Sequence, residues 1–297
     1  MRRTAEALAG ATRSLTAAGS PSPAAEARTL LAHVAGTEPK QLYRIAGLDD
    51  EQAARLDELV GRRADGIPVQ HLTGEAWFRT VQLAVGPGVF VPRPETEVMT
   101  GWALDQLHAA RRTRGLAHPV VVELCAGSGA ISKAVAAELE GAEQYAVELD
   151  ETAFGWAQRN LAGTGVELRH GDMATAFTEL DGGVDLVIAN PPYIPLEAWE
   201  SVAADVRDHD PALALWSGDD GLDTTRVVAQ VAGRLLRPGG LVCSEHAEVQ
   251  RASAVRVFVE HGGFERVQDH DDLAGRPRFV SAQRRGPAGP GVAGWGA

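Results

Sequence analysis

The sequence has few cysteines, almost no lysine and no long apolar run. Its two cysteines, Cys125 and Cys243, are too few for a disulfide framework or a cysteine-rich zinc site. No apolar stretch approaches the roughly 20 residues that a membrane-spanning helix needs, and residues 1–15 lack the continuous apolar core of a signal peptide. We therefore expect a protein of the reducing cytoplasm that does not bind a membrane.

Positive charge is also scarce. The 297 residues include 40 Asp and Glu against 28 Lys and Arg, which gives a net charge of −12 at pH 7, and only Lys40 and Lys133 are lysines. Binding to nucleic acid without sequence preference needs clustered Lys and Arg, so we expect no direct contact with nucleic acid. The 44% hydrophobic and 23% charged residues are typical of a globular protein. The length favours two domains, or one domain with a sizeable appendage.

Residues 1–70 are predicted to form a small helical domain that recognises the substrate. Ser22 stands before Pro23 as an N-cap followed by a proline at the first helical position. Another helix begins near Asp49, where Gln52 completes the pattern of a capping box. No strand pattern occurs before residue 70.

Residues 71–94 are predicted to form a β-hairpin connector between two domains. Val81, Leu83 and Val85 alternate with other residues, as in a strand with one buried face. The segment ends in Pro92-Arg93-Pro94, whose prolines make the backbone stiff and extended.

Residues 95–284 are predicted to form an α/β domain, and the Gly- and Pro-rich residues 285–297 a disordered tail. After a helix over residues 95–112, short apolar runs alternate with helical segments. This alternation implies a mostly parallel sheet with helices on both faces. The predicted strands cover residues 119–124, 144–149, 166–169, 184–189, 240–245, 264–269 and 278–282.

The first group of candidate site residues surrounds a glycine turn. Glu123 lies at the end of the first of these strands, and Gly127 and Gly129 lie in the turn before the next helix. Glycine lets backbone amides approach a ligand closely. Glu148 ends the following strand, roughly 20 residues on, which is the spacing at which a carboxylate binds ribose hydroxyls. S-adenosylmethionine, which is cationic and lacks phosphate, fits this pattern, with Glu123 at its amino group and Glu148 at its ribose.

The second group is Asn190-Pro191-Pro192-Tyr193, directly after the strand over residues 184–189. Ligands of open α/β sheets bind outside the carboxyl ends of the strands. A planar NH2 group is a poor nucleophile, because its lone pair is delocalised. The Asn190 side-chain oxygen and the Pro191 carbonyl can each accept one of its hydrogens, which aims the nitrogen at a methyl donor. Tyr193 offers a flat wall for a planar group.

With these motifs, the sequence resembles the protein-(glutamine-N5) methyltransferases of the peptide chain release factor type, the PrmC/HemK family. The resemblance extends to about residue 282. The segments that carry it are Gly66-Ile-Pro-Val-Gln-His-Leu-Thr-Gly74, Phe90-Val-Pro-Arg-Pro-Glu-Thr-Glu97, Gly127-Ser-Gly129-Ala-Ile, Asn190-Pro-Pro-Tyr-Ile194, Asp210-Pro-Ala-Leu213, Gly218-Asp-Asp-Gly-Leu-Asp223, Pro238-Gly239-Gly240 and Gly275-Arg-Pro-Arg278.

The resemblance implies a Rossmann-like methyltransferase fold with a seven-stranded sheet. It implies methyl transfer from S-adenosylmethionine to the glutamine of the Gly-Gly-Gln motif of class 1 release factors, and hence a role in translation termination. Catalysis would then rest on Asn190, Pro191 and Tyr193, and the substrate glutamine would also meet Pro192. The implied cofactor-binding residues are Glu123, Cys125, Ala126, Gly127, Ser128, Gly129, Glu148, Asp172, Met173 and Asn190.

The sequence departs from the family pattern at three of these places. Cys125-Ala126 stands where the family usually has Gly-Thr, Glu148 replaces the usual Asp, and Met173 stands where an aromatic residue is frequent. None of these changes removes a chemical group that the mechanism requires.

Other functions fit parts of the pattern. A glutamine methyltransferase acting on a ribosomal protein would share these motifs, and so would an N6-adenine methyltransferase, which the acidic charge disfavours. A catalytically silent protein that binds S-adenosylmethionine is disfavoured by the intact Asn190 and Tyr193. No metal site is expected, because the histidines lack metal-ligand spacing. Arg93, Glu95 and Glu97 either shape the mouth of the pocket or bind the substrate protein, or they form an ion-pair network between domains. We expect a monomer.

Overall fold

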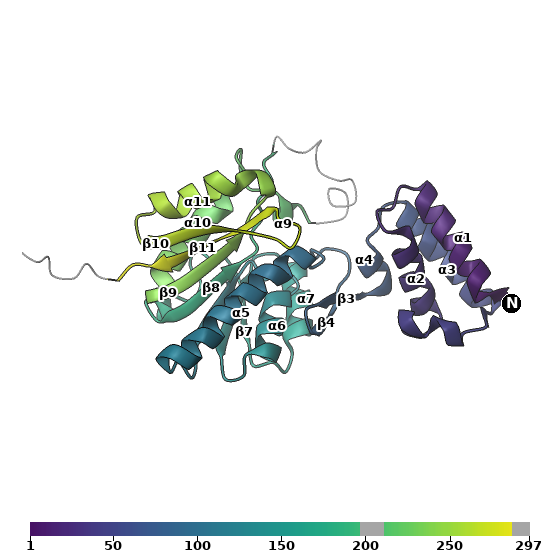
Figure 1. Ribbon diagram of the computed structural model, residues 1–297, viewed down its shortest axis with the longest axis horizontal. Helices are drawn as coiled ribbons and strands as arrows, with labels where there is room; N and C mark the ends of the chain where they lie inside the picture. Colours follow the sequence, from purple (N-terminus) through teal and green to yellow (C-terminus); the bar gives the residue numbers. More distant parts are fainter. Residues whose placement is uncertain (197–210, 287–297) are drawn as a thin grey trace, which may run out of the picture. The chain divides into compact units, whose positions relative to one another are not determined.

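The computed structural model describes residues 1–196 and 211–286, which fall into two compact units (Figure 1). The N-terminal unit holds Met1–Ala76 and Ala84–Val91. The C-terminal unit holds Trp77–Leu83 together with residues 92–196 and 211–286. The predicted tail over residues 285–297 lies, from residue 287 on, outside the described residues.

The N-terminal unit is helical, as predicted. Its helices are α1 (Thr4–Ala17), α2 (Pro23–Val34), η1 (Pro39–Arg44, a 3-10 helix), α3 (Asp50–Ala64) and α4 (Val69–Thr73). The expectation of no strand before residue 70 was wrong, because β1 (Arg2–Arg3) pairs antiparallel with β2 (Gly47–Leu48). Two residues are too few to produce an alternating pattern. Helix α4 was also not predicted, since five residues show no helical period.

The helix caps of this unit follow the sequence only in part. Asp49 and Gln52 form the predicted capping box, with the Gln52 N–H donating to Asp49 at 2.8 Å and the Asp49 N–H donating to Gln52 at 3.1 Å. Ser22 occupies the N-cap position of α2, but its side chain makes no capping hydrogen bond. This unit has an apolar core of its own, whose buried leucines are Leu15, Leu30, Leu31, Leu42, Leu48, Leu56, Leu59 and Leu72.

The predicted hairpin consists of β3 (Glu75–Phe78) and β4 (Val81–Ala84), which form a two-stranded sheet. Leu83 is buried on one face of β4. Gly74 ends α4 in the left-handed conformation, with φ of 78°, and so lets the chain turn from helix into strand.

The C-terminal unit is built on a seven-stranded sheet in the order β10-β11-β9-β8-β5-β6-β7. Neighbours from β9 to β7 are parallel, whereas β11 is antiparallel to both β9 and β10. This confirms the predicted mostly parallel sheet. The strands are β5 (Val120–Leu124), β6 (Glu143–Glu148), β7 (Glu167–His170), β8 (Val184–Ala189), β9 (Leu236–Glu245), β10 (Phe264–Asp271) and β11 (Pro277–Arg284).

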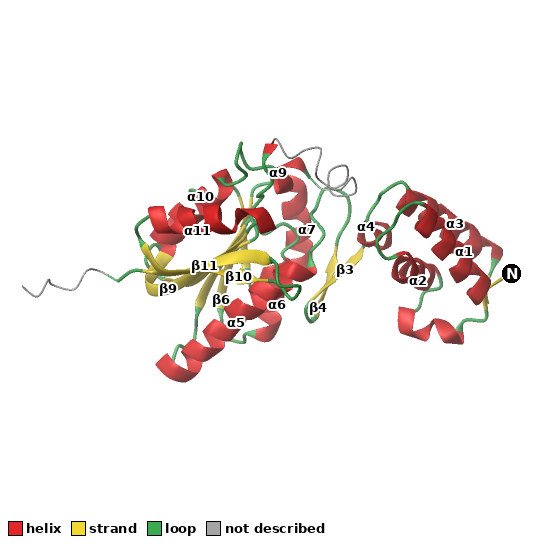
Figure 2. Ribbon diagram, turned by 45° about the horizontal axis from the view of Figure 1, so that its top comes forward, coloured by secondary structure: helices red, strands yellow, loops and turns green. Residues whose placement is uncertain are grey.

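Helices cover both faces of this sheet (Figure 2). One group comprises α10 (Asp223–Leu235) and α11 (Arg251–Glu260), which pack on each other and on the sheet. The other comprises α5 (Pro94–Arg114), α6 (Ala130–Glu138) and α7 (Glu151–Leu161), in which α6 contacts both of its neighbours. Within the described part of this unit, the remaining short helices are η2 (Thr178–Leu180), α9 (Ala212–Leu215) and η4 (Glu248–Gln250).

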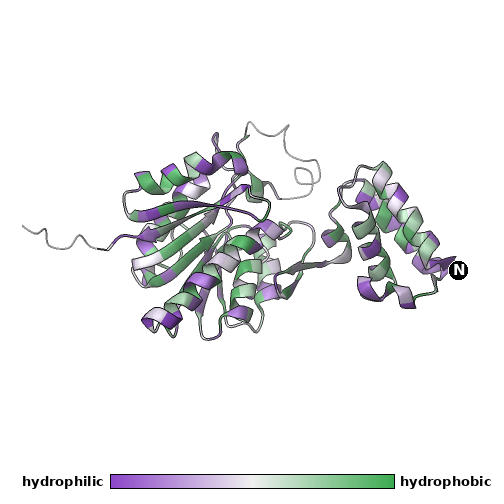
Figure 3. Cartoon of the chain, viewed as in Figure 1, coloured by the Kyte–Doolittle hydropathy of each residue, from purple (hydrophilic) through white to green (hydrophobic). Residues whose placement is uncertain are grey.

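The core of this unit lies along the central strands, where hydrophobic residues recur (Figure 3). All six residues of β8 are buried, as expected for a strand covered on both faces. Each fully buried Val, Leu or Ile of such a strand contributes about 1.5–3 kcal/mol. No helix within the described ranges is long and apolar enough to cross a membrane.

Candidate active site

The carboxyl ends of β5, β8 and β9 bring the two predicted groups of site residues into one region. Leu124 pairs with Ala189, and Ala189 pairs with Ser244. The residues that follow these positions therefore leave the sheet side by side. They are the glycine turn after β5, Asn190 after β8, and Glu245 at the end of β9.

The turn between β5 and α6 has three residues in the left-handed conformation. Cys125, Gly127 and Gly129 have φ values of 57°, 54° and 77°. A Cβ on Gly129 would lie 3.0 Å from Leu161 of α7, whereas a Cβ on Gly127 would meet nothing within 4 Å. Gly129 thus permits close helix packing. Gly127 leaves open space of the kind that a ligand approaching the backbone requires.

Glu123 is buried and connects β5 to the first turn of α6. Its Oε2 accepts hydrogen bonds from the Ser132 N–H, at 2.8 Å, and from the Ser132 hydroxyl. Burial raises the pKa of Glu123 to about 8, although both hydrogen bonds act in the opposite direction. One carboxylate oxygen of this predicted cofactor residue is therefore used inside the protein.

Glu148 holds the glycine turn from the end of β6. Its Oε2 accepts from the Gly127 N–H at 2.7 Å, and its Oε1 accepts from the Asp150 N–H at 2.8 Å. The residue is 9% exposed, and burial raises its pKa. The carboxylate therefore stands beside the open space above Gly127, where ribose hydroxyls are predicted to bind.

The other predicted cofactor residues surround this turn. The Cys125 Sγ lies 3.8 Å from the Met173 Sδ, and the Ser128 carbonyl accepts from the Asn160 side chain at 2.9 Å. The charge of Asp172 is close enough to help raise the pKa of the Cys125 thiol, which burial raises most. A raised pKa favours the neutral thiol, which is a weaker nucleophile than the thiolate.

Asn190 is held by a side chain from the Pro-Arg-Pro-Glu-Thr-Glu segment. Its Nδ2 donates to the Thr96 Oγ1 at 3.2 Å. The Thr96 hydroxyl donates to the Glu245 Oε2 at 2.7 Å. The Tyr193 hydroxyl donates to the Glu245 Oε1 at 3.1 Å. Glu245 thus joins both polar side chains of the predicted catalytic segment.

Neither Thr96 nor Glu245 was a predicted site residue. Glu245 is 1% exposed, and burial raises its pKa to about 7, while Thr96, Arg278 and Tyr193 oppose that rise. Two features of the sequence could have pointed to them. Thr96 lies inside the Pro-Arg-Pro-Glu-Thr-Glu motif, and Glu245 is an acidic residue at the end of the predicted strand over residues 240–245. Sequence alone did not show that this strand lies next to β8.

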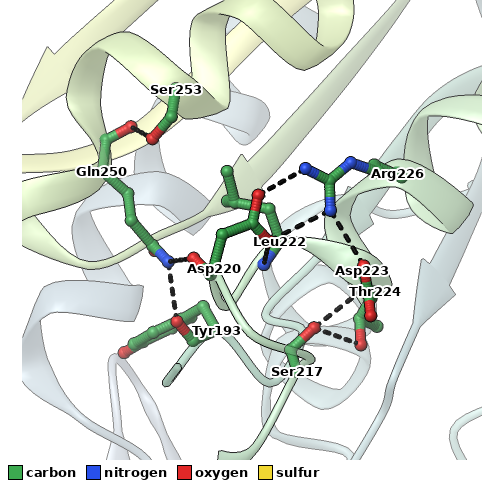
Figure 4. Close-up of polar contacts among 9 residues, drawn as sticks. All are labelled: Tyr193, Ser217, Asp220, Leu222, Asp223, Thr224, Arg226, Gln250 and Ser253. Atoms are coloured by element: carbon green, nitrogen blue, oxygen red, sulfur yellow. Dashed lines mark hydrogen bonds and ion pairs between the residues drawn. The ribbon is translucent and has the colours of Figure 1, made fainter. Parts of the chain in front are cut away.

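The backbone of Tyr193 is held by the side chain of Gln250, as Figure 4 shows. The Gln250 Nε2 donates to the Tyr193 carbonyl at 2.8 Å and to the Asp220 carbonyl at 3.1 Å. Gly221, with φ of 74°, fits against this contact, because a Cβ there would lie 2.4 Å from the Tyr193 oxygen. The quoted Gly218-Asp-Asp-Gly-Leu-Asp223 segment therefore supports the loop that carries the predicted catalytic residues.

The fold and the site define a methyltransferase. Residues 121–209 match the family model described as a methyltransferase domain, and residues 6–74 match the PrmC N-terminal domain. The glycine turn, the acidic strand ends and the open space at Gly127 fit S-adenosylmethionine, which is the cofactor of this enzyme.

Full-length relatives identify the family. The chain is 49% identical over 280 residues to a release factor glutamine methyltransferase of Streptomyces coelicolor, covering 94% of this chain and 98% of that protein. It is 42% identical over 286 residues to the corresponding protein of Mycolicibacterium smegmatis, covering 96% and 99%. The chain belongs to the release factor glutamine methyltransferase family.

One further relative carries a different name. The chain is 42% identical over 256 residues, or 86% of either chain, to a 4-amino-L-phenylalanine/4-methylamino-L-phenylalanine methyltransferase of Streptomyces pristinaespiralis.

Proposed function

We propose that the protein transfers a methyl group from S-adenosylmethionine to the side-chain amide nitrogen of the glutamine in the Gly-Gly-Gln motif of class 1 release factors. The observation that carries the proposal is the placement of Asn190 at the end of β8, with its NH2 group bonded to Thr96. This contact leaves the Asn190 Oδ1 to accept a hydrogen from a substrate. The proposed substrate places the reaction in the cytoplasm.

The chain's own residues would orient the substrate amide. The Asn190 Oδ1 and the Pro191 carbonyl each accept one hydrogen of the substrate NH2 group. Both acceptors favour the pyramidal nitrogen of the transition state over the planar amide. The Pro191-Pro192 backbone keeps the acceptors in place, and the Tyr193 ring lies against the amide plane. Bound S-adenosylmethionine would supply an electrophilic methyl group and leave as S-adenosylhomocysteine. The substrate nitrogen would then give up one of its two hydrogens as a proton to water.

We assign cofactor binding to the residues around the β5–α6 turn. Glu148 would bind the ribose, and Glu123 the amino group through its second oxygen. Cys125 and Met173 would contact the adenine side of the pocket. The remaining members of the proposed cofactor site are Ala126, Gly127, Ser128, Gly129, Asp172 and Asn190.

The test is incubation of the full chain with labelled S-adenosylmethionine and unmodified release factors, followed by mass spectrometry of the Gly-Gly-Gln peptide. One added methyl group on that glutamine is expected. Parallel reactions offer ribosomal proteins and adenine-containing DNA. Methylation of either of these, with none on the release factor, would replace the proposed substrate.

The Asn190→Ala variant is the matched control for this experiment. It removes one amide acceptor while leaving the glycine turn and Glu148 in place. The methylation rate should fall roughly 10²- to 10³-fold, while calorimetry should still detect S-adenosylmethionine binding. Near-normal single-turnover methylation by this variant, with saturating cofactor, would remove Asn190 from its assigned role.

A second candidate substrate is the aromatic amine of 4-amino-L-phenylalanine. The relative from Streptomyces pristinaespiralis favours it, and an arylamine poses the same chemical problem, because its nitrogen lone pair is delocalised into the ring. The same assay with this amino acid separates the two proposals. Methylation of the free amino acid but not of the release factor would support the second.

A further inference from the structure

The contact between Asn190 and Thr96 raises the question of which way the asparagine amide faces. An asparagine side chain can rotate by half a turn and exchange its oxygen and its NH2 group at nearly the same positions. Only one orientation presents the oxygen to a substrate NH2 group. An asparagine in this role therefore needs a neighbour that distinguishes oxygen from nitrogen.

Thr96 alone would not make that distinction. A hydroxyl can donate one hydrogen bond and can also accept, so it could pair with either end of the Asn190 amide. Glu245 decides the direction in which the Thr96 hydroxyl donates, because it accepts the hydroxyl hydrogen at 2.7 Å. An ionised carboxylate only accepts. The Thr96 oxygen is thus left with lone pairs toward Asn190, and at 3.2 Å it receives the Asn190 NH2 group.

Glu245 is itself fixed on its other side. Its Oε1 accepts the Tyr193 hydroxyl at 3.1 Å, and burial raises the pKa of that phenol, so Tyr193 remains a donor. Glu245 is the last residue of β9 and pairs with Phe279 of β11. Both carboxylate oxygens therefore have a donor, and the group sits on the sheet rather than on a loop.

We propose that Glu245 and Thr96 are positioning residues that lock the Asn190 amide with its oxygen toward the substrate. The proposal rests on the proposed function, because it assigns that oxygen to the substrate amide. It also gives a reason for a threonine in the Pro-Arg-Pro-Glu-Thr-Glu segment. We call the two hydrogen bonds from Asn190 to Thr96 and from Thr96 to Glu245 the relay.

The experiment compares Thr96→Val with Thr96→Ser in the full chain. Valine keeps the shape but removes the hydroxyl, whereas serine restores the hydroxyl. We expect Thr96→Val to lower single-turnover methylation of a release factor roughly tenfold to hundredfold, with unchanged affinity for S-adenosylmethionine. Thr96→Ser should recover most of the lost rate.

Thr100→Val is the matched control. Thr100 lies one turn later on α5, is also buried, and donates to the Thr96 carbonyl at 2.9 Å without entering the relay. This variant should keep the wild-type rate. A double variant separates positioning from general damage, since Thr96→Val added to Asn190→Ala should cost little further rate. A full additional loss in the double variant, or wild-type rate in Thr96→Val, would overturn the proposal.

A second readout does not depend on the substrate. The side-chain NH2 signal of Asn190, assigned by its loss in Asn190→Ala, should show slow hydrogen exchange in the wild type. Exchange should speed up in Glu245→Gln, because the amide introduced there can donate to Thr96 and release the Thr96 hydroxyl to the Asn190 oxygen. Unchanged exchange in that variant would contradict the relay. Failure of the wild type to methylate release factors would instead count against the proposed function alone.

Discussion

The two acidic residues at the ends of β5 and β6 have different partners. Glu123 bonds to both donors of Ser132 inside the protein. Glu148 bonds to the backbone of Gly127, beside the space that a ligand can enter. At the scale of single residues, we therefore expect removal of Glu148 to weaken cofactor binding more than removal of Glu123.

We expect Glu148→Ala to weaken S-adenosylmethionine binding more than it lowers turnover at saturating cofactor. Charge-assisted hydrogen bonds are worth about 1.5–3 kcal/mol, so the dissociation constant should rise roughly tenfold to hundredfold. Calorimetry measures this change. Glu151→Ala, which removes the same charge from an exposed position on α7, serves as the control. An unchanged dissociation constant in Glu148→Ala would take this residue out of the site.

The rate of methyl transfer should rise with pH through about 7. Glu245 has a pKa raised to about 7 by burial, with Glu95 acting in the same direction and Arg278, Thr96 and Tyr193 opposing. Ionised Glu245 accepts from both Thr96 and Tyr193, and protonation removes that constraint. The rate should therefore be lost as pH falls below 7. The single-turnover pH profile of the wild type measures this fall in rate. In Glu245→Gln the rate should not fall in this way below pH 7.

The contribution of Glu245 to the stability of the fold should change with pH in the direction opposite to the methylation rate. The folded-state pKa of Glu245 lies above its ordinary value of 4.5, so the folded state binds more protons between these values. The contribution of Glu245 to the free energy of unfolding consequently falls as pH rises from about 4.5 to 7. Loss of rate on acidification cannot then be ascribed to unfolding through this group. A rate that is constant between pH 6 and 8 would contradict the role given to the Glu245 carboxylate.

Among the elements, the turn from β5 into α6 carries backbone strain at a residue other than glycine. Cys125 has φ of 57°, a conformation that disfavours any residue with a Cβ. We expect Cys125→Gly to be more stable than Cys125→Ala by about 1 kcal/mol in denaturant unfolding, because glycine accepts positive φ without cost.

The second cysteine provides a comparison, because there we expect the glycine variant to be less stable than the alanine variant. Cys243 lies within β9, where glycine is less stable than alanine by roughly 0.5–1 kcal/mol. Cys243→Gly should accordingly be the less stable of its pair. If alanine were the more stable residue at both positions, the backbone of the turn would not be the source of strain at Cys125.

For the molecule as a whole, the two units have separate apolar cores. The leucines of the N-terminal helices form one cluster, and the strands of the sheet form another. All proposed cofactor residues belong to the C-terminal unit. We propose that residues 1–70 recognise the protein substrate and that residues 95–284 bind the cofactor and carry the reaction, with the hairpin over 71–94 as the connector.

Removal of residues 1–70 should leave S-adenosylmethionine binding measurable by calorimetry and abolish methylation of an intact release factor. Circular dichroism and light scattering confirm beforehand that the shortened protein is folded and monodisperse. Exposed apolar residues of the remaining segment, such as Leu72, make this check necessary. Full methylation of the release factor by the shortened protein would refute the assignment of substrate recognition to this unit.

The sequence predicted most of the sheet, because its strands are short apolar runs bounded by turns. The run over residues 184–189 corresponds to β8 without any shift. Elements without a pattern of their own were missed, namely the two-residue strands β1 and β2 and the five-residue helix α4. The backbone hydrogen bonds of these short elements depend on neighbouring segments, and their sequences show no hydrophobic period that would predict them.

The sequence by itself determined the class of fold and the Asn190–Tyr193 segment, because these follow from local patterns along the chain. Only the tertiary structure decided what holds that segment. Thr96 and Glu245 are 149 residues apart, and they meet because β9 lies beside β8 and α5 packs on the sheet. The direction of the hydrogen bonds at Asn190 then follows from a buried carboxylate that only accepts. Spacing in a sequence does not carry that information, since it is set by which strand ends become neighbours.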